Sequence, residues 1–438
     1  MNIIRKKGIQ PAPSSASDEI PFYRPGMFVS LQFADFRRLW LSNLAASFAM
    51  QMQAVARGWL IYDMTSSALA LTWVMLSFML PFFVFSLAGG VIADRLQKKS
   101  IMLYSQILNM IATMFLAQII YSGDVTFWHF IFFGIFNGTV LAFSWPARSS
   151  MVPEVVGTDS LVNAMALQSA TLNLSRILGP VLAGGMIAFT ASVAPESSQG
   201  IGLVFYIIAG LYALSAISVY TLDYEGTPAQ RDASSPFEDI REGFRYMRDE
   251  KLIVGILLLG FIPLMFGFAP SFLLPAFNQD VIDGGPDDLG MLMAGMGAGA
   301  LIGSLLLARL GDVGSKGRLL FTTAYCWAIS IVVFSLTDQV WTAMVVGAIS
   351  GLFGAVFGAM NMSILQMAIK PEIRGRVMSI MMMTHGLMPL GIIPVSAAAE
   401  FIGIDVAIMI SALLLALSTF LLGVIFPGLR SIDRGHSS

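Results

Sequence analysis

The sequence has few charged residues and a single cysteine. Of its 438 residues, 12% are charged and 56% are hydrophobic, whereas about 25% of the residues of soluble domains are charged. Cys326 can form no internal disulfide and belongs to no metal-binding motif. The chain also lacks a nucleotide-binding loop after a strand and a cluster of metal ligands. These shortages exclude an ordinary soluble domain and argue against an enzyme, an ATP-driven pump, a bound cofactor and a nucleic-acid partner.

Long apolar runs fill most of the chain instead. A helix that crosses the hydrocarbon core of a bilayer needs about 20 mostly apolar residues, and windows of that length predict twelve such helices. The predicted spans cover residues 39–62, 69–93, 100–121, 126–147, 162–190, 200–222, 252–278, 288–308, 318–337, 340–367, 376–399 and 405–427. We therefore expect an all-α membrane protein with twelve transmembrane helices.

The positions of lysine and arginine indicate how the spans are oriented. When the spans alternate from a cytosolic start, 23 of the 25 cations fall on the cytosolic side, as the positive-inside rule requires. The loops on the other side carry carboxylates and no lysine or arginine. We expect both termini in the cytosol. The two remaining cations, Arg57 and Arg176, fall within spans.

One long polar stretch divides the predicted spans into two sets of six. Within it, apolar residues at 237, 240, 244 and 247 have the spacing of an amphipathic helix that lies on the inner membrane surface. Two bundles joined by such a linker are typical of transporters built from parallel repeats. We predict a cytosolic tail (1–35), an N-terminal six-helix bundle (36–222), a linker (223–251), a C-terminal six-helix bundle (252–427) and a second cytosolic tail (428–438).

A tight charged turn follows the second predicted span. It contains Gly90, Asp94, Arg95, Lys98 and Lys99. The spacing resembles the charged turn between the second and third spans of the major facilitator superfamily, except that a glutamine stands where the second glycine is usual. A decayed copy, with Gly303, Arg309, Gly311, Asp312, Gly317 and Arg318, lies between the eighth and ninth predicted spans. A plain positive-inside anchor is the alternative interpretation of the turn.

The resemblance implies a gating role for the charged turn. In the superfamily, the aspartate that matches Asp94 faces the positive end of the eleventh helix and stabilises the closed inner gate of the outward-facing state. Here that helix begins near Arg376, and Arg148 is the candidate partner of Asp94 in an ion pair. Arg309 and Arg318 take the corresponding places in the second copy.

The fifth predicted span contains a glycine–proline pair, Gly179 and Pro180. Residues of small side chain recur every four positions around it, at Thr171, Ser175 and Ala183. Such a face allows a neighbouring helix to approach closely, and the proline permits a bend. The pair resembles the signature of superfamily exporters on the fifth helix, although ordinary packing of small residues explains the spacing equally well.

Two spans carry a cation at membrane depth, where charge is costly and is usually functional or paired. Arg57 shares one face of the first span with Asn43 and Gln53, and the same spacing predicts that Gln51 points away. Arg176 shares a face of the fifth span with Asn173. The alternatives are that Arg57 extends to the outer headgroups and that Arg176 bonds neighbouring helix carbonyls. If either faces the central cavity, it favours an anionic substrate.

Further polar residues are candidates for the substrate cavity. Helices one, four, seven and ten line the cavity in this superfamily, so the resemblance assigns Asn137, Asn361 and Gln366 to it. His385 is the only deep group that titrates near neutral pH, although a lone buried histidine is more often a core residue.

The coupling ion is left open by the sequence. No aspartate or glutamate falls in the middle of a predicted span, and proton-coupled transporters often use such a carboxylate. Coupling could instead use Asp63 or Glu400 at outer ends, or the charge of the substrate itself.

Three further strings resemble the bacterial branch of the superfamily that includes enterobactin exporters and transmembrane secretion effectors. They are Phe36-Arg37-Arg38-Leu39-Trp40 with Gln51, Trp59, Tyr62 and Thr65-Ser66-Ser67; Asn163-Ala164 and Gln168-Ser169 with Asn173, Arg176 and Gly179-Pro180; and Arg374-Gly375-Arg376-Val377-Met378-Ser379.

The resemblance implies a monomeric secondary exporter of the bacterial inner membrane. It would move a small anionic or amphipathic molecule by alternating access, coupled as an antiporter to a proton or another ion. A lysophospholipid flippase and an uptake permease for a small organic anion are the alternatives. The intact charged turn argues against a receptor that transports nothing.

Overall fold

The computed structural model describes residues 29–193, 197–224, 250–310, 314–369, 377, 381 and 388–430. Within these ranges the regular structure is entirely helical. After the short 3-10 helix η1 (Val29–Gln32), the first group of helices is α1 (Ala34–Thr65), α2 (Ala68–Arg95), α3 (Lys98–Tyr121), α4 (Phe127–Val193) and α5 (Ser197–Tyr220). The second is α7 (Lys251–Gly267), α8 (Ala269–Asp280), α9 (Pro286–Leu310), α10 (Lys316–Ser335), α11 (Val340–Ala368), α13 (Met388–Ile402) and α14 (Ile404–Ile425), followed by η2 (Pro427–Leu429).

The helices follow the predicted spans, and ten described segments are long and apolar enough to cross a membrane. The two predicted spans outside these ten correspond to α1 and α13. The first of them carries serine, asparagine and glutamine side chains among its apolar residues, and the second is 15 residues long in the described part of the chain. The composition of α1 and the described length of α13 therefore leave these two helices outside the ten.

Two breaks in the helices show where the chain departs from regular geometry. The long helix α4 consists of two spans, Phe127–Gly157 and Ser160–Ser192, separated at Gly157, which has φ 68° and ψ 179°. Glycine adopts this conformation without the steric cost that a side chain would bring. Between α7 and α8 the break falls at Phe268, two residues before Pro270, which cannot donate a helical hydrogen bond.

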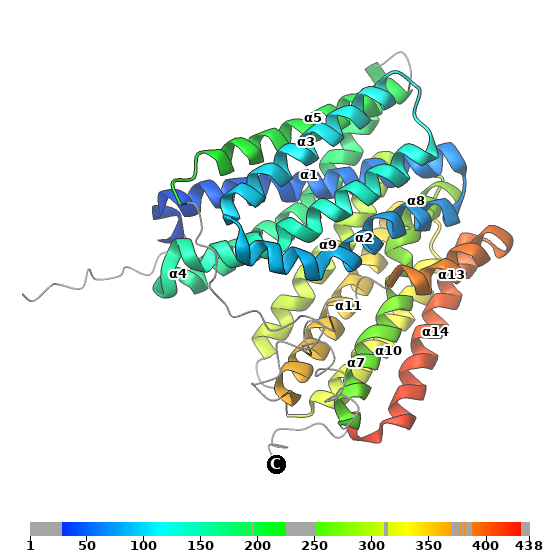
Figure 1. Cartoon of the computed structure of the whole chain (residues 1–438). Coiled ribbons are helices and arrows are strands. Elements are labelled where there is room, and N and C mark those ends of the chain that lie inside the picture. Colours follow the sequence, from blue (N-terminus) through cyan, green and yellow to red (C-terminus); the bar gives the residue numbers. More distant parts are fainter. Residues whose placement is uncertain are drawn as a thin grey trace, which may run out of the picture.

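The helices form two groups (Figure 1), which we call the N-terminal group (α1–α5) and the C-terminal group (α7–α14). In the N-terminal group, α4 packs against α1 and α2, and α3 packs against α5. In the C-terminal group, α9 packs against α11, and α10 against α14. In Figure 1 the blue-to-green helices of the first group and the helices of the second, which run from green at α7 to red at α14, meet at the right and diverge toward the left and the bottom.

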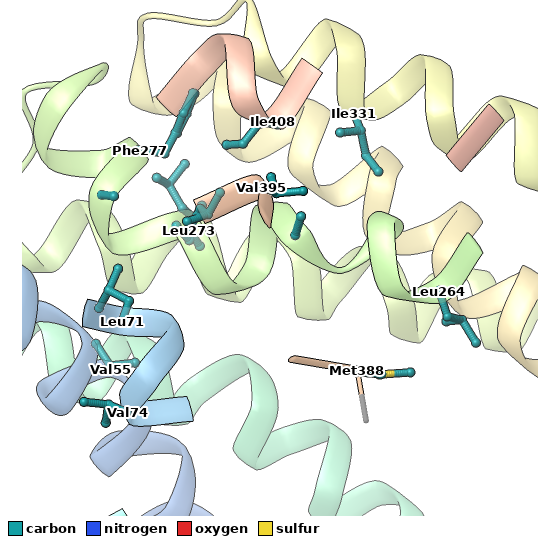
Figure 2. Packing of buried hydrophobic residues seen from close by; sticks show 14 of the residues in the cluster. Val55, Leu71, Val74, Leu264, Leu273, Phe277, Ile331, Met388, Val395 and Ile408 are labelled. Atoms are coloured by element: carbon teal, nitrogen blue, oxygen red, sulfur yellow. The ribbon is translucent and has the colours of Figure 1, made fainter. Parts of the chain in front are cut away.

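One apolar cluster continues from the first group into the second. It contains Val55, Leu71 and Val74 of α1 and α2, and Leu273 and Phe277 of α8. Figure 2 shows these side chains around the place where the two groups meet. A separate cluster, with Phe36, Leu39, Ile101, Met102 and Met151 among its members, lies wholly within the N-terminal group. Among the described residues, the apolar cluster that the two groups share includes side chains where α1 and α2 meet α8.

Candidate functional site

A cavity of about 590 Å³ lies between the two groups of helices. Its walls come from α1, α2 and the second span of α4 on one side, and from the α7–α8 break, α9, α10 and α11 on the other. The lining residues are Gln51, Met75, Met79, Arg176, Gly267, Phe268, Pro270, Ser271, Phe272, Leu274, Met293, Met296, Gly297, Ala300, Trp327, Ser350, Gly351, Gly354 and Ala355. We call this space the central cavity.

Arg176 is the only ionisable residue in the described lining of the central cavity. Around it the walls are mainly methionine, aromatic and small side chains, and Phe268 and Trp327 meet edge to face with ring centroids 5.8 Å apart. Methionine adapts to irregular apolar surfaces, while a guanidinium binds carboxylate or phosphate oxygens through paired hydrogen bonds. The lining therefore suits an organic molecule that carries an anionic group.

The charge of Arg176 is not neutralised by a described carboxylate. The ion pairs among the described residues are Arg38 with Asp35, Arg38 with Asp223, and Lys98 with Glu154. Arg176 is exposed in the cavity wall. A cation at membrane depth without a carboxylate partner is a candidate for binding an anionic ligand.

Four hydrogen bonds join the two groups at one end. Tyr62 Oη donates to Asp280 Oδ2 at 2.5 Å, and the Ser67 hydroxyl donates to Glu400. Glu400 also accepts from the backbone N–H of Leu69 at 3.2 Å. In addition, the hydroxyl groups of Thr72 and Ser396 lie 2.6 Å apart. These are all the side-chain hydrogen bonds between the two groups in the described part of the chain, and we call this region the closed end.

We predict that Tyr62→Phe weakens the closed end. The substitution removes a hydrogen bond to a carboxylate, which contributes about 1.5–3 kcal/mol, so the groups should separate there more often. Spin labels at Asp63→Cys and Phe401→Cys, in a Cys326→Ser background, would report a longer distance. Tyr206→Phe is the matched control, because Tyr206 bonds Gln118 at 2.5 Å within the N-terminal group. An unchanged distance in Tyr62→Phe would contradict the prediction.

The glycine–proline pair of the fifth predicted span lies where α4 meets its neighbours. A Cβ added at Gly179 would come within 2.7 Å of Gln51 Cβ on α1. A Cβ added at Gly290 of α9 would come within 2.6 Å of the Pro180 carbonyl oxygen, and one at Gly184 within 2.2 Å of the Pro286 carbonyl oxygen. The small residues therefore allow α4 and α9 to pack backbone to backbone across the two groups.

Many of the described cations lie at the opposite end of the molecule, where the following contacts join residues of the same group. Lys98 pairs with Glu154, and Lys99 donates to the backbone carbonyl of Leu222, both within the N-terminal group. In the C-terminal group, a Cβ at Gly317 would come within 2.2 Å of the Leu429 carbonyl oxygen. We call this region the cation-rich end. Arg95, Arg309 and Arg318 are exposed there, at the ends of α2 and α9 and the start of α10.

The structure reverses the predicted orientation of two glutamines on α1. Gln51, which the spacing predicts to point away, lines the central cavity. Gln53 is buried and its amide donates to the Thr113 hydroxyl of α3 at 3.2 Å. Asn43 is also buried, outside the described cavity lining. The reason is that α1 packs against α4 and α5, so its most polar face is turned into the N-terminal group.

A second set of polar residues gathers inside the N-terminal group rather than in the described cavity wall. Asn137 donates to Asn109 at 3.2 Å and lies near the Tyr212 hydroxyl. Arg57 and Arg148 both lie within electrostatic range of the Tyr212 hydroxyl, and the Arg57 guanidinium lies 6.0 Å from the centre of the Phe78 ring. Sequence reasoning missed Tyr212, although a buried tyrosine hydroxyl needs a polar partner.

The other predicted cavity residues lie elsewhere. Asn173 donates to the Ser169 carbonyl of its own helix at 2.9 Å. Asn361 is fully buried and donates to the Ile256 carbonyl at 3.1 Å. Gln366 is exposed near the end of α11 and outside the described lining. The structure thus brings Arg176 to the cavity and places these amides away from it.

Four of the predicted site residues are not placed in full. Arg376 and His385 lie outside the described residues, and at Gly90 and Asp94 the structure describes the backbone of α2 only. The predicted contact between Asp94 and Arg148 stays a prediction. The amphipathic helix predicted within the linker, with apolar residues at 237, 240, 244 and 247, lies outside the described residues as well.

The family is shown by comparison with known proteins. The family model described as "Transmembrane secretion effector" matches residues 26–435. The chain belongs to this family of the major facilitator superfamily. It is therefore a multi-pass membrane transporter of small molecules rather than an enzyme.

Similar proteins agree with this assignment. The chain is 24% identical over 384 residues to macrolide efflux protein A of Streptococcus pyogenes, covering 87% of this chain and 93% of the relative. It is 26% identical to the enterobactin exporter EntS of Shigella boydii, covering 78% and 79%. The fold matches the crystal structure of a bacterial homologue of the human lysosomal transporter Spinster, in an inward-facing and unoccupied conformation, with a TM-score of 0.70, 15% identity and coverage of 92% and 98%.

Proposed function

We propose that this protein is a secondary active exporter of a small anionic or amphipathic molecule. The observation that carries the proposal is the central cavity, which lies between two groups of helices and contains Arg176 as its only described ionisable residue. A site shared by two groups that can rock against each other is the basis of alternating access. The printed names of the relatives, an efflux protein and an exporter, support outward transport.

The proposal places twelve spans in the bacterial inner membrane with both termini in the cytosol. Because cytosolic loops carry the excess of lysine and arginine, the cation-rich end would face the cytosol and the closed end would face outward. The conformation described is then inward-facing, the state in which an exporter loads its substrate. A monomer is sufficient, since both walls of the cavity come from one chain.

Coupling to a proton or another ion completes the proposal. The described cavity lining contains no carboxylate, so a coupling group would lie elsewhere. Glu400 accepts hydrogen bonds from the N-terminal group at the closed end, and Asp63 is exposed nearby on α1. Either carboxylate, or the charge of the substrate, could link ion movement to the conformational change.

A deletion strain tests the proposed function most directly. Mass spectrometry would compare the compounds retained inside cells that carry no gene, the wild-type gene or the Arg176→Ala variant. We expect an anionic metabolite that accumulates without the gene and that only the wild-type gene removes. Equal clearance of the metabolite by the wild-type gene and by Arg176→Ala would contradict a role of Arg176 in substrate binding. If no compound accumulates in the deletion strain, export itself is contradicted.

We predict that Asp94→Asn reduces transport without removing the protein from the membrane. The charged turn would stabilise the closed inner gate through the negative charge of Asp94, so the amide should depopulate the outward-facing state. Transport rate per protein, with membrane levels determined by immunoblot, is the measurement. Normal turnover by a well-expressed Asn variant would refute the gating role.

A further inference from the structure

A second hollow lies on the other side of the contact between α4 and α9. This apolar groove has a volume of about 460 Å³ and is lined by Ile177 of α4 and by small and aliphatic residues of α9 and α11. Gly295 and Gly299 let the backbones of these two helices touch, since added Cβ atoms would come within 2.8 and 1.7 Å of carbonyl oxygens of α11. Val345 and Ile349 at its edge are 55% and 44% exposed, which in a membrane protein marks a surface that faces lipid.

Alternate faces of α9 line the two hollows. Met293, Met296 and Ala300 face the central cavity, whereas Ala294 and Ala298 face the groove. On α4 the change comes between adjacent residues, because Arg176 lines the cavity and Ile177 the groove. The only described cation of the cavity wall is therefore one residue away from the apolar groove.

The partition between the two hollows is thin at Gly297. This residue has no side chain, and a Cβ added there would lie 3.2 Å from the Arg176 carbonyl oxygen and 3.3 Å from Ile177 Cγ1. A small shift of α4 against α9 would thus connect the cavity beside Arg176 with the groove. The remaining contacts along this line, at Gly184 and Gly290, also involve glycine and carbonyl oxygens.

We propose that the substrate is a single-chain amphipath whose anionic head binds Arg176 and whose alkyl chain passes beside Gly297 into the apolar groove. This inference rests on the proposed function and narrows its substrate class. The guanidinium supplies charge complementarity to a phosphate or carboxylate head. The groove offers aliphatic contacts and no hydrogen-bonding group, which suits methylene groups and excludes a polar body.

Photocrosslinking of purified protein in nanodiscs tests where the chain lies. The probe is dodecyl phosphate with a diazirine at the far end of its chain, and mass spectrometry maps the attachment sites. We expect attachment at Val345, Ala348 or Ile349, suppression of that signal by excess butyl phosphate, and several-fold less of it in Arg176→Gln. The same chain with a trimethylammonium head is the control for charge. Any labelling of these positions by this cationic probe should be unaffected by butyl phosphate.

A second variant separates the groove from the cavity. Ala298→Leu extends a side chain into the groove and should abolish attachment there while butyl phosphate still binds. Groove labelling that is insensitive to butyl phosphate and to Arg176→Gln would overturn the inference, because bilayer lipid would then fill the groove independently of the head site.

Two other outcomes distinguish this inference from the proposed function. In the first, butyl phosphate suppresses labelling, but the labelled residues are Met293, Met296 or Trp327 of the central cavity. The alkyl chain would then stay inside the cavity, which refutes binding in the groove and still supports an anionic substrate. No suppressible labelling at any position would contradict anion binding itself.

Discussion

Arg176→Ala is expected to abolish binding of an anionic substrate in the central cavity. Hydrogen bonds to charged groups contribute about 1.5–3 kcal/mol each, so the loss of one or two of them lowers affinity by about ten- to ten-thousandfold. Lysine keeps the charge but not the paired geometry, and Arg176→Lys should bind with intermediate affinity. The measurements are calorimetric titration with butyl phosphate and retention of the exported compound in the complemented deletion strain.

Arg309→Ala is the matched control for the calorimetric titration. Arg309 is also an arginine in a helix of the protein, but it is exposed at the end of α9 and outside the described cavity lining. Its removal should leave affinity unchanged. Equal affinity of the Arg176→Ala variant and the wild-type protein would show that the cavity does not use this cation.

Gly184→Val is expected to hold the closed end apart and to stop transport. The first added carbon would lie 2.2 Å from the Pro286 carbonyl oxygen and 3.0 Å from its carbon, and both atoms belong to backbone that cannot rotate away. Overpacking of this kind costs about 1–3 kcal/mol or more. Because the clash arises only while α4 and α9 are in contact across the groups, the conformation with that end open should be favoured.

The neighbouring glycine supplies the control. A Cβ added at Gly185 meets nothing within 4 Å, so Gly185→Val should leave both the conformation and transport near their wild-type values. Spin labels at Asp63→Cys and Phe401→Cys would report the separation in both variants. An unchanged distance in Gly184→Val, or an equal change in the two variants, would contradict the role of this contact.

Hydropathy predicts the helices well because the bilayer imposes their length and apolar surface. Each predicted span has a helix, and even the α7–α8 break follows from prolines visible in the sequence. The start of the eleventh predicted span, at 376, stays a prediction, because the helix is described from Met388. There the intervening residues lie largely outside the described chain.

Of the residues that line the central cavity, the sequence predicts Arg176. Arg176 stood out because a mid-span cation is rare. The orientation of α1 could not be predicted, because the spacing of polar residues does not say which neighbouring helix the polar face contacts. Gln53 donates a hydrogen bond to Thr113 of α3 instead of lining the cavity. The bond between Tyr62 and Asp280 joins residues 218 positions apart, and no local pattern in the sequence indicates such a pair.

The strength of the closed end sets how long the transporter stays in one conformation. Four hydrogen bonds hold it. Three of them end on a carboxylate and contribute about 1.5–3 kcal/mol each, and the hydroxyl pair contributes about 0.5–1.5 kcal/mol, which gives roughly 5–10 kcal/mol in all. A ligand of micromolar affinity releases about 8 kcal/mol on binding. The part of this binding free energy that differs between the two conformations can therefore compete with the hydrogen bonds of the closed end. A single substitution among them should change dwell times, and with them turnover, by about ten- to a hundredfold without any change to the cavity.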